Sequence, residues 1–157
     1  FSLNGLVGFD LHEKTIGIVG TGKIGFHVIK NLSGFGCKII AYDPYQNDEV
    51  KKYGTYTSLE EVFMNSDIIT FHTPATKESY HMVNADTIKT MKDGVVLINT
   101  ARGSIIDTGA FIDAVENGKI GAAALDVIEN ELGIFYGDYK YQNEKQKGHF
   151  VNYFYIQ

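Results

Sequence analysis

A glycine-rich run at residues 15–25, TIGIVGTGKIG, constrains the fold of this chain more than any other feature. Apolar and small residues lead into the run as a strand does, and the residues after its glycines have the apolar spacing of a helix. Gly20 permits the tight turn between strand and helix, Gly22 lets the backbone approach a pyrophosphate, and Gly25 lets the helix pack closely on the strand. The helix start then offers free N–H groups and the positive end of its dipole to phosphates.

A second strand pattern, residues 37–42, ends at Asp43, 18 residues after Gly25. A carboxylate there can accept hydrogen bonds from a ribose 2′-hydroxyl and repels a 2′-phosphate. In its strand–turn–helix context, the run with this acid predicts that the chain binds a dinucleotide and prefers NAD to NADP. The alternative is a plain strand–helix–strand turn whose glycines serve packing only.

Composition indicates an ordinary globular protein. The 157 residues are 44% hydrophobic and 21% charged with a net charge of −5, which favours one domain and disfavours nucleic acid or an anionic membrane as a partner. No apolar run approaches the ~20 residues of a membrane helix, and no signal peptide is recognised. The single cysteine, Cys37, excludes an internal disulfide, and no pair of residues has metal-ligand spacing. We therefore expect a cytoplasmic protein without a metal site.

Strand and helix patterns alternate along the chain, which predicts an α/β fold: a Rossmann-type doubly wound parallel sheet in a single domain. Helices are then expected on both faces, and ligands at the carboxyl ends of the strands. Strands are predicted at residues 15–20, 37–42, 67–72, 94–100 and 121–126, and helices at residues 23–33, 48–53, 58–64, 85–91 and 108–116.

Several polar residues at predicted strand ends are candidates for chemistry. Arg102 follows a buried strand, so its guanidinium is placed either to bind a carboxylate or to pair with a surface acid. Asp126, Glu129 and Glu131 form an acidic group that can orient ligands or simply be solvated. His72 is either catalytic or a structural histidine with its hydrogen bonds satisfied, and the structural alternative is favoured.

Three motifs resemble the D-isomer-specific 2-hydroxyacid dehydrogenases over residues 1–137. They are residues 20–25 with Asp43, residues 99–103 with 106–108, and residues 118–127 with Glu129 and Glu131. Residues 1–6, 43–45, 80–84 and 130–136 are similar to the fermentative D-lactate dehydrogenase branch of that family.

The resemblance implies roles for individual residues. Arg102 would bind the pyruvate carboxylate and polarise the keto oxygen, Glu131 would keep a catalytic histidine protonated, and Asp126 would face the nicotinamide. Cofactor contacts implied elsewhere are the backbone of Lys23 and Ile24 at the pyrophosphate, Thr73 and Pro74 at the adenosine, Thr100 and Ala101 at the nicotinamide, and Ser79, where relatives often have asparagine.

The resemblance also implies a division of the chain. Residues 1–10 are expected to be an interdomain linker, residues 11–137 the NAD-binding domain, and residues 138–157 a divergent or truncated tail. The substrate domain is expected to be absent. The catalytic histidine is also expected to be missing, because no apolar strand pattern precedes His149. The parent enzyme would be a homodimer that reduces pyruvate to D-lactate, and this chain would bind NAD with little turnover. The alternatives are a non-catalytic NAD-sensing module similar to corepressors, or a dehydrogenase of another 2-keto acid.

Overall fold

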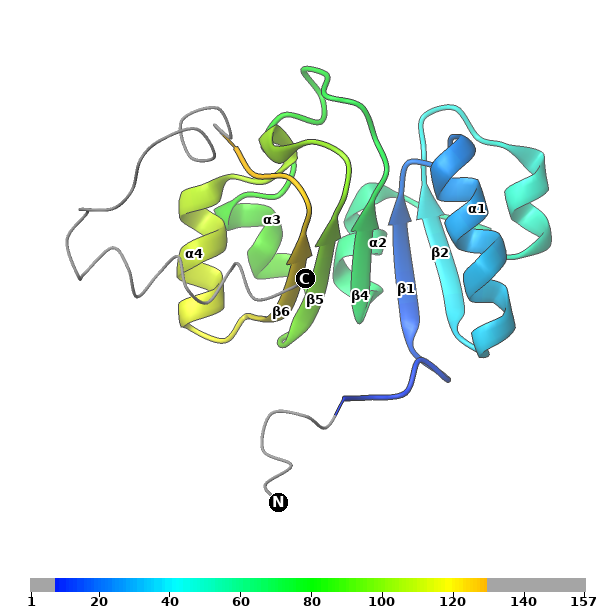
Figure 1. The fold of residues 1–157 in the computed structure, drawn as a ribbon, viewed down its shortest axis with the longest axis horizontal. Coiled ribbons are helices and arrows are strands. Elements are labelled where there is room, and N and C mark those ends of the chain that lie inside the picture. The colour runs from blue at the N-terminus through cyan, green and yellow to red at the C-terminus, as the bar shows by residue number, and fades with distance from the viewer. Residues whose placement is uncertain (1–7, 130–157) are drawn as a thin grey trace.

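The computed structural model describes residues 8–129, which form a six-stranded parallel sheet with the strand order β3-β2-β1-β4-β5-β6 (Figure 1). The doubly wound α/β fold is thereby confirmed. The strands are β1 (Thr15–Val19), β2 (Lys38–Tyr42), β3 (Thr55–Tyr56), β4 (Ile68–Phe71), β5 (Val95–Asn99) and β6 (Ile120–Leu125). The α-helices are α1 (Lys23–Leu32), α2 (Leu59–Asn65), α3 (Ala85–Thr90) and α4 (Thr108–Glu116), and the 3₁₀ helices are η1 (Ser33–Phe35), η2 (Asp48–Lys52) and η3 (Gly103–Ile105).

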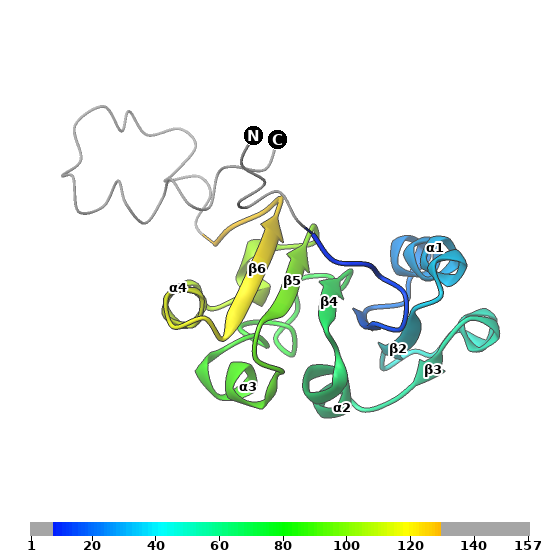
Figure 2. The same cartoon turned by 90° about the horizontal axis from the view of Figure 1, so that it is seen from below.

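Helices cover both faces of the sheet. Figure 2 shows α1 on one face and α2, α3 and α4 on the other. Because successive side chains of a strand point to opposite faces, β1 contributes to two cores. Ile16 and Ile18 pack with Ile29 of α1, whereas Val19 packs with Val62 and Phe63 of α2. Burial on both faces explains why the strands have nearly continuous apolar sequences.

Most predicted elements are confirmed to within two residues, and the predicted helix at 108–116 has the bounds of α4. The predicted short helix at 48–53 is a five-residue 3₁₀ helix, η2. The prediction omitted β3, whose two residues are too few to show alternation. This strand lies against β2 through the pairs Ile40↔Thr55 and Ala41↔Tyr56, at the edge of the sheet.

The sheet has a switch point between β1 and β4, because the chain leaves β1 toward β2 and leaves β4 toward β5 on the other side. The loops that follow these two strands therefore diverge at the carboxyl edge of the sheet, and ligands bind in the crevice that such divergence creates.

Asp67 holds the opposite edge of the sheet together. Its carboxylate accepts hydrogen bonds from the backbone N–H of Thr15 (2.8 Å) and from Nζ of Lys92 (2.9 Å). Burial alone would raise the pKa of Asp67, but these hydrogen bonds and the nearby lysine charge outweigh it and lower the pKa below its usual 3.8.

Candidate functional site

The turn after β1 requires glycine at two positions for reasons of packing. Gly20 has a φ of +94°, and a Cβ on it would lie 2.7 Å from the carbonyl carbon and oxygen of His72. A Cβ on Gly25 would collide with the carbonyl oxygen of Gly20. The turn, the start of α1 and the end of β4 are therefore packed backbone against backbone.

Gly22 differs from these two glycines because the space in front of it is open. A Cβ built on Gly22 has no atom within 4 Å. Gly22 is also the N-cap of α1, and it offers no side-chain cap. By contrast, the side chains of Ser58, Asn84 and Asp107 cap α2, α3 and α4. The start of α1 thus combines an absent side-chain cap with open space at Gly22, an arrangement that suits a phosphate.

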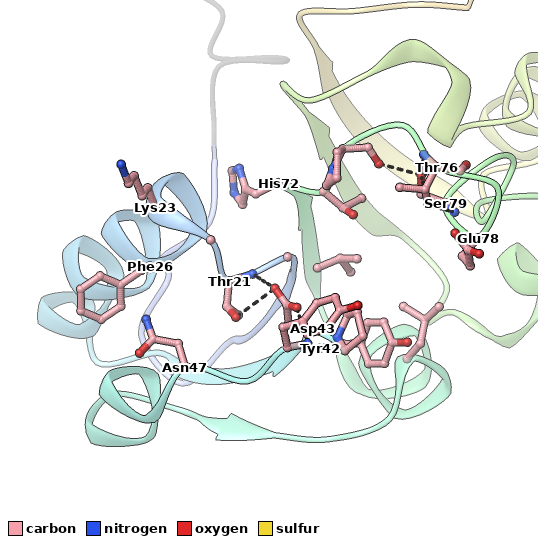
Figure 3. A pocket seen from close by; sticks show the side chains of 18 of the residues that line it. Thr21, Lys23, Phe26, Tyr42, Asp43, Asn47, His72, Thr76, Glu78 and Ser79 are labelled. Atoms are coloured by element: carbon pink, nitrogen blue, oxygen red, sulfur yellow. Dashed lines mark hydrogen bonds between the residues drawn. The ribbon is translucent and has the colours of Figure 1, made fainter.

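Asp43 lies directly beside this turn (Figure 3). Its Oδ2 accepts hydrogen bonds from the backbone N–H of Thr21 (2.7 Å) and from the Thr21 hydroxyl (3.1 Å). Its Oδ1 accepts one from the backbone N–H of Tyr45 (2.8 Å). A carboxylate offers about four acceptor positions, so one position on Oδ1 remains for a ligand. The residues present therefore fit a dinucleotide: the start of α1 at Gly22 can bind a phosphate, and Asp43 has a free acceptor position for a ribose hydroxyl.

These features border one pocket of about 1000 Å³ at the carboxyl edge of the sheet (Figure 3). This volume is at the upper end of the range for small-molecule sites. Of the predicted cofactor residues, those that line it are Gly20, Gly22, Lys23, Asp43, Thr73, Pro74 and Ser79. His72, a candidate from its place at a strand end, also lines the pocket. The prediction missed the other lining residues: Val19, Thr21, Phe26, His27, Tyr42, Pro44, Tyr45, Asn47, Leu59, Thr76, Glu78 and Met82. Most of these follow the strands in loops, where apolar periodicity gives no signal.

His72 lines the same pocket, and its environment favours the structural alternative. Its Nε2 lies 3.1 Å from the hydroxyl of Thr70. Burial lowers the pKa of His72 from 6.5, because a buried imidazole is harder to charge. The ring is therefore neutral at pH 7, which suits packing beside the glycine turn better than proton donation.

Ser79 organises the loop after β4. This side chain is 2% exposed, and its hydroxyl accepts a hydrogen bond from the N–H of Thr76 (2.8 Å) and donates one to the carbonyl of Pro74 (2.7 Å). The hydroxyl proton is thus used within the loop that carries Thr73 and Pro74. A direct contact between Ser79 and a cofactor stays a prediction.

Arg102 stands in a second turn, after β5, at the same edge of the sheet. Buried Asn99 builds this turn: its Nδ2 donates to the carbonyl of Arg102 (2.9 Å) and its Oδ1 accepts from the N–H of Ala101 (3.0 Å). The N–H of Asp126 donates to the carbonyl of Asn99 (3.0 Å), which brings the end of β6 beside it. Arg102 and Asp126 are both exposed to solvent.

The remaining predicted residues fall into two groups. Ile24, Gly25, Thr100, Ala101, Arg102 and Asp126 do not line the pocket that Asp43 borders. Glu131 and His149 lie outside the described residues, as does the predicted tail at 138–157. The predicted roles of all these residues therefore stay predictions.

His81 links the loop after β4 to the end of β6, a contact that the sequence analysis did not anticipate. Its Nε2 lies 2.7 Å from Oε1 of Glu129, and its Nδ1 lies 3.5 Å from Oδ2 of Asp107. Glu129 stands 48 residues further along the chain, so no local spacing signals the pair. Gly103 packs against the backbone of Ile128, which fixes the Arg102 turn to the same segment.

No group of three histidine, cysteine or acidic residues among residues 8–129 is placed to hold a metal ion. Within the same residues, no helix has the length and apolar character to span a membrane.

Comparisons with known proteins agree with this geometry. Over 139 residues the chain is 50% identical to a 2-hydroxyacid dehydrogenase homolog of Haemophilus influenzae and 48% identical to an aromatic 2-oxoacid reductase of Clostridium sporogenes. Each match covers 88% of this chain and 42% of the relative. The D-lactate dehydrogenase of Aquifex aeolicus, solved in complex with NAD and lactic acid, matches with a TM-score of 0.83 and 39% identity, covering 93% of this chain and 44% of that one.

The chain therefore spans less than half of the length of these relatives. Residues 2–150 match the family model described as "D-isomer specific 2-hydroxyacid dehydrogenase, NAD binding domain". With its glycine turn, its uncapped helix and the acid at the end of β2, this chain belongs to the D-isomer-specific 2-hydroxyacid dehydrogenase family, of which it is an NAD-binding domain.

Proposed function

We propose that this chain supplies the cofactor half of an NAD-dependent reductase of small 2-keto acids, and that pyruvate, reduced to D-lactate, is the substrate. The observation that carries the proposal is the shared edge of the sheet. Open space in front of Gly22 and the free acceptor of Asp43 border one pocket, and the Arg102 turn follows β5 at the same edge.

The residues that would hold the dinucleotide come from loops at this edge of the sheet. The backbone N–H groups of Lys23 and Ile24 bind the pyrophosphate, because they start an uncapped helix. Asp43 accepts a hydrogen bond from the adenosine ribose, and Thr73 and Pro74 lie against the adenosine side. Further contacts are proposed at the nicotinamide, from Thr100, Ala101 and Asp126.

Bound NADH supplies the hydride that reduces the keto carbon. Arg102 binds the substrate carboxylate through its planar guanidinium and polarises the keto oxygen, so that negative charge developing on that oxygen is stabilised. Glu131 holds a histidine in its protonated form, and this histidine gives the proton to the oxygen. We do not assign that histidine to His149, because the sequence of residues 142–147, QNEKQK, is polar and does not resemble the apolar segment expected before a catalytic histidine of this family.

We also propose that residues 1–10 are an interdomain linker, residues 11–137 the NAD-binding domain and residues 138–157 a divergent or truncated tail. In the whole enzyme, a substrate domain would close over the Arg102 turn and exclude water from the reaction. We further propose that the whole enzyme is a cytoplasmic homodimer.

A fluorescence titration of this chain with NADH, followed by addition of pyruvate in the same cuvette, tests the proposal. Micromolar-range binding that Asp43→Ala weakens, with little pyruvate reduction, is the expected result. Turnover by the chain alone would mean that His149 or another group supplies the proton. An absence of NADH binding would contradict the proposal.

A larger 2-keto acid is a second candidate substrate. It is favoured by the 48% identity to the aromatic 2-oxoacid reductase of Clostridium sporogenes. A panel of pyruvate, phenylpyruvate and 2-ketoisocaproate, assayed with a substrate domain added back, separates the two candidates. A domain that binds NADH but reduces none of these acids would instead indicate an NAD-sensing module.

A further inference from the structure

We propose that Tyr56, on the edge strand β3, and Thr21, in the glycine turn, are positioning residues that set the preference of this domain for NADH over NADPH. They act through Asp43, whose carboxylate they hold in place. This inference rests on the proposed cofactor function and adds to it a determinant outside the glycine motif.

A chain of hydrogen bonds runs from Asn47, the N-cap of η2, to Asp43. The backbone N–H of Asn47 donates to the Tyr56 hydroxyl oxygen (2.9 Å), which lies 2.7 Å from the hydroxyl of Thr21. The Thr21 hydroxyl lies 3.1 Å from Oδ2 of Asp43. Two hydroxyls therefore connect the loop after β2 to the acid that ends this strand.

The direction of each hydrogen bond follows from the chemistry of the groups. A carboxylate only accepts, so the hydroxyl proton of Thr21 goes to Asp43. The Thr21 oxygen is then left as an acceptor, and the hydroxyl of Tyr56 donates to it. Every donor in the chain thus points toward the carboxylate, an alignment in which each hydrogen bond strengthens the next.

All three hydrogen-bond donors to Asp43, from Thr21 and Tyr45, are neutral groups. None of the ion pairs among residues 8–129 includes Asp43. These hydrogen bonds hold the carboxylate in a fixed orientation beside the pocket, and no cation among these residues is paired with it. A fixed charge repels a 2′-phosphate, whereas its free acceptor position suits a ribose hydroxyl.

The pairing of β3 with β2 positions Tyr56. Thr57 donates its N–H to the carbonyl of Ala41, which continues the pairing of β3 with β2. Gly54 allows this close approach, because a Cβ there would lie 2.8 Å from Cγ2 of Ile39. The short edge strand thereby brings the Tyr56 hydroxyl to the turn after β1, across β2.

Four variants of this chain test the inference by titration with NADH and with NADPH. Tyr56→Phe keeps the ring and removes the hydroxyl, and Thr21→Val removes the other hydroxyl at nearly constant volume. Thr21→Ser restores a hydroxyl. Tyr53→Phe is the matched control, because Tyr53 packs on Phe26 nearby and its hydroxyl has no part in the Asp43 network. The melting temperature of each variant shows whether its stability matches that of the wild type.

We expect Tyr56→Phe and Thr21→Val to weaken NADH binding by about three- to tenfold, the value of one or two hydrogen bonds. NADPH forms no hydrogen bond with the Asp43 carboxylate, and each variant keeps the acid that repels the 2′-phosphate. We therefore expect the affinity for NADPH to change by less than about twofold and the preference for NADH to fall. Thr21→Ser and Tyr53→Phe should behave like the wild type.

Equal weakening of NADH and NADPH binding would show that the two residues have a merely structural role, and would overturn the inference. Unchanged NADH binding in Tyr56→Phe would overturn it as well. If the wild-type chain binds NADH but the variants do not show the expected change in cofactor preference, the proposed cofactor function stands and the inference about Tyr56 and Thr21 fails. If the wild type does not bind NADH, both fail.

Discussion

Replacing Gly22 or Gly25 with alanine separates the two uses of glycine in the turn after β1. A Cβ on Gly25 would collide with the carbonyl oxygen of Gly20, and no flexible side chain is there to move away. A Cβ on Gly22 meets no atom within 4 Å, and the φ of −60° at this residue is open to alanine. Gly25→Ala therefore affects the fold, whereas Gly22→Ala affects mainly the space for a ligand.

The expected magnitudes differ accordingly. Forcing a methyl group against backbone costs about 1–3 kcal/mol, so Gly25→Ala should lower the free energy of unfolding by that amount. For a domain of this size, the melting temperature would fall by roughly 3–10 °C. Gly22→Ala should change the stability by less than about 1 kcal/mol, because a small N-cap penalty opposes the entropy that alanine removes from the unfolded chain.

Urea unfolding and NADH titration of the same two proteins give the assay. Gly22→Ala is expected to unfold like the wild type and to bind NADH more than about tenfold more weakly, since its methyl group occupies the seat of the pyrophosphate. Normal NADH binding by Gly22→Ala would refute the assignment of that seat. A Gly22→Ala protein as unstable as Gly25→Ala would refute the packing argument itself.

Three further predictions concern stability and its dependence on pH. The pKa of Asp67 is lowered in the folded state, so its contribution to folding stability is present above pH 3.8 and is lost as the pH falls through the folded-state pKa. Asp67→Asn should lower the free energy of unfolding, measured with urea, by about 1 kcal/mol at pH 7. The difference from the wild type should be smaller near pH 3. The pKa of His72 is also lowered, so as the pH falls below 6.5 this residue binds a proton in the unfolded chain before it does so in the folded chain. The wild type should therefore lose more stability between pH 7.5 and 5.5 than His72→Gln. Equal losses would contradict the burial of the ring. His81→Ala should lower the free energy of unfolding by about 1 kcal/mol through loss of the contact with Glu129 while leaving NADH affinity within about twofold, and a large loss of affinity would place His81 at the cofactor instead.

The parts of the fold that the sequence could predict are those whose signal is local. The apolar spacing after Gly22 predicts α1, and the apolar run at residues 94–100 predicts a strand covered on both faces, because each pattern is complete within one element. The acid at the end of β2 could be predicted for the same reason, since its distance from the glycine turn is fixed by one strand–helix–strand unit.

The parts that the sequence could not predict depend on residues far apart. Tyr56 acts on Asp43 only because a two-residue strand pairs with β2, and two residues show no periodicity. The contact between His81 and Glu129 joins loops that follow different strands, so only the assembled sheet brings them together. Ser79 was predicted from its position in the family motif, and its hydrogen bonds inside the loop require the loop conformation to be known.

The start of α1 has no side-chain cap, so a ligand bound there would stabilise the folded domain. Without such a ligand, amide exchange in the first turn of α1 should be faster than at the capped starts of α2 and α4. A bound dinucleotide acts as the fourth cap, and at ten times its dissociation constant it adds ~1.4 kcal/mol to the stability. A cell rich in the cofactor would therefore keep more of this domain folded, and beyond the reach of proteases, than a cell that has run short of it.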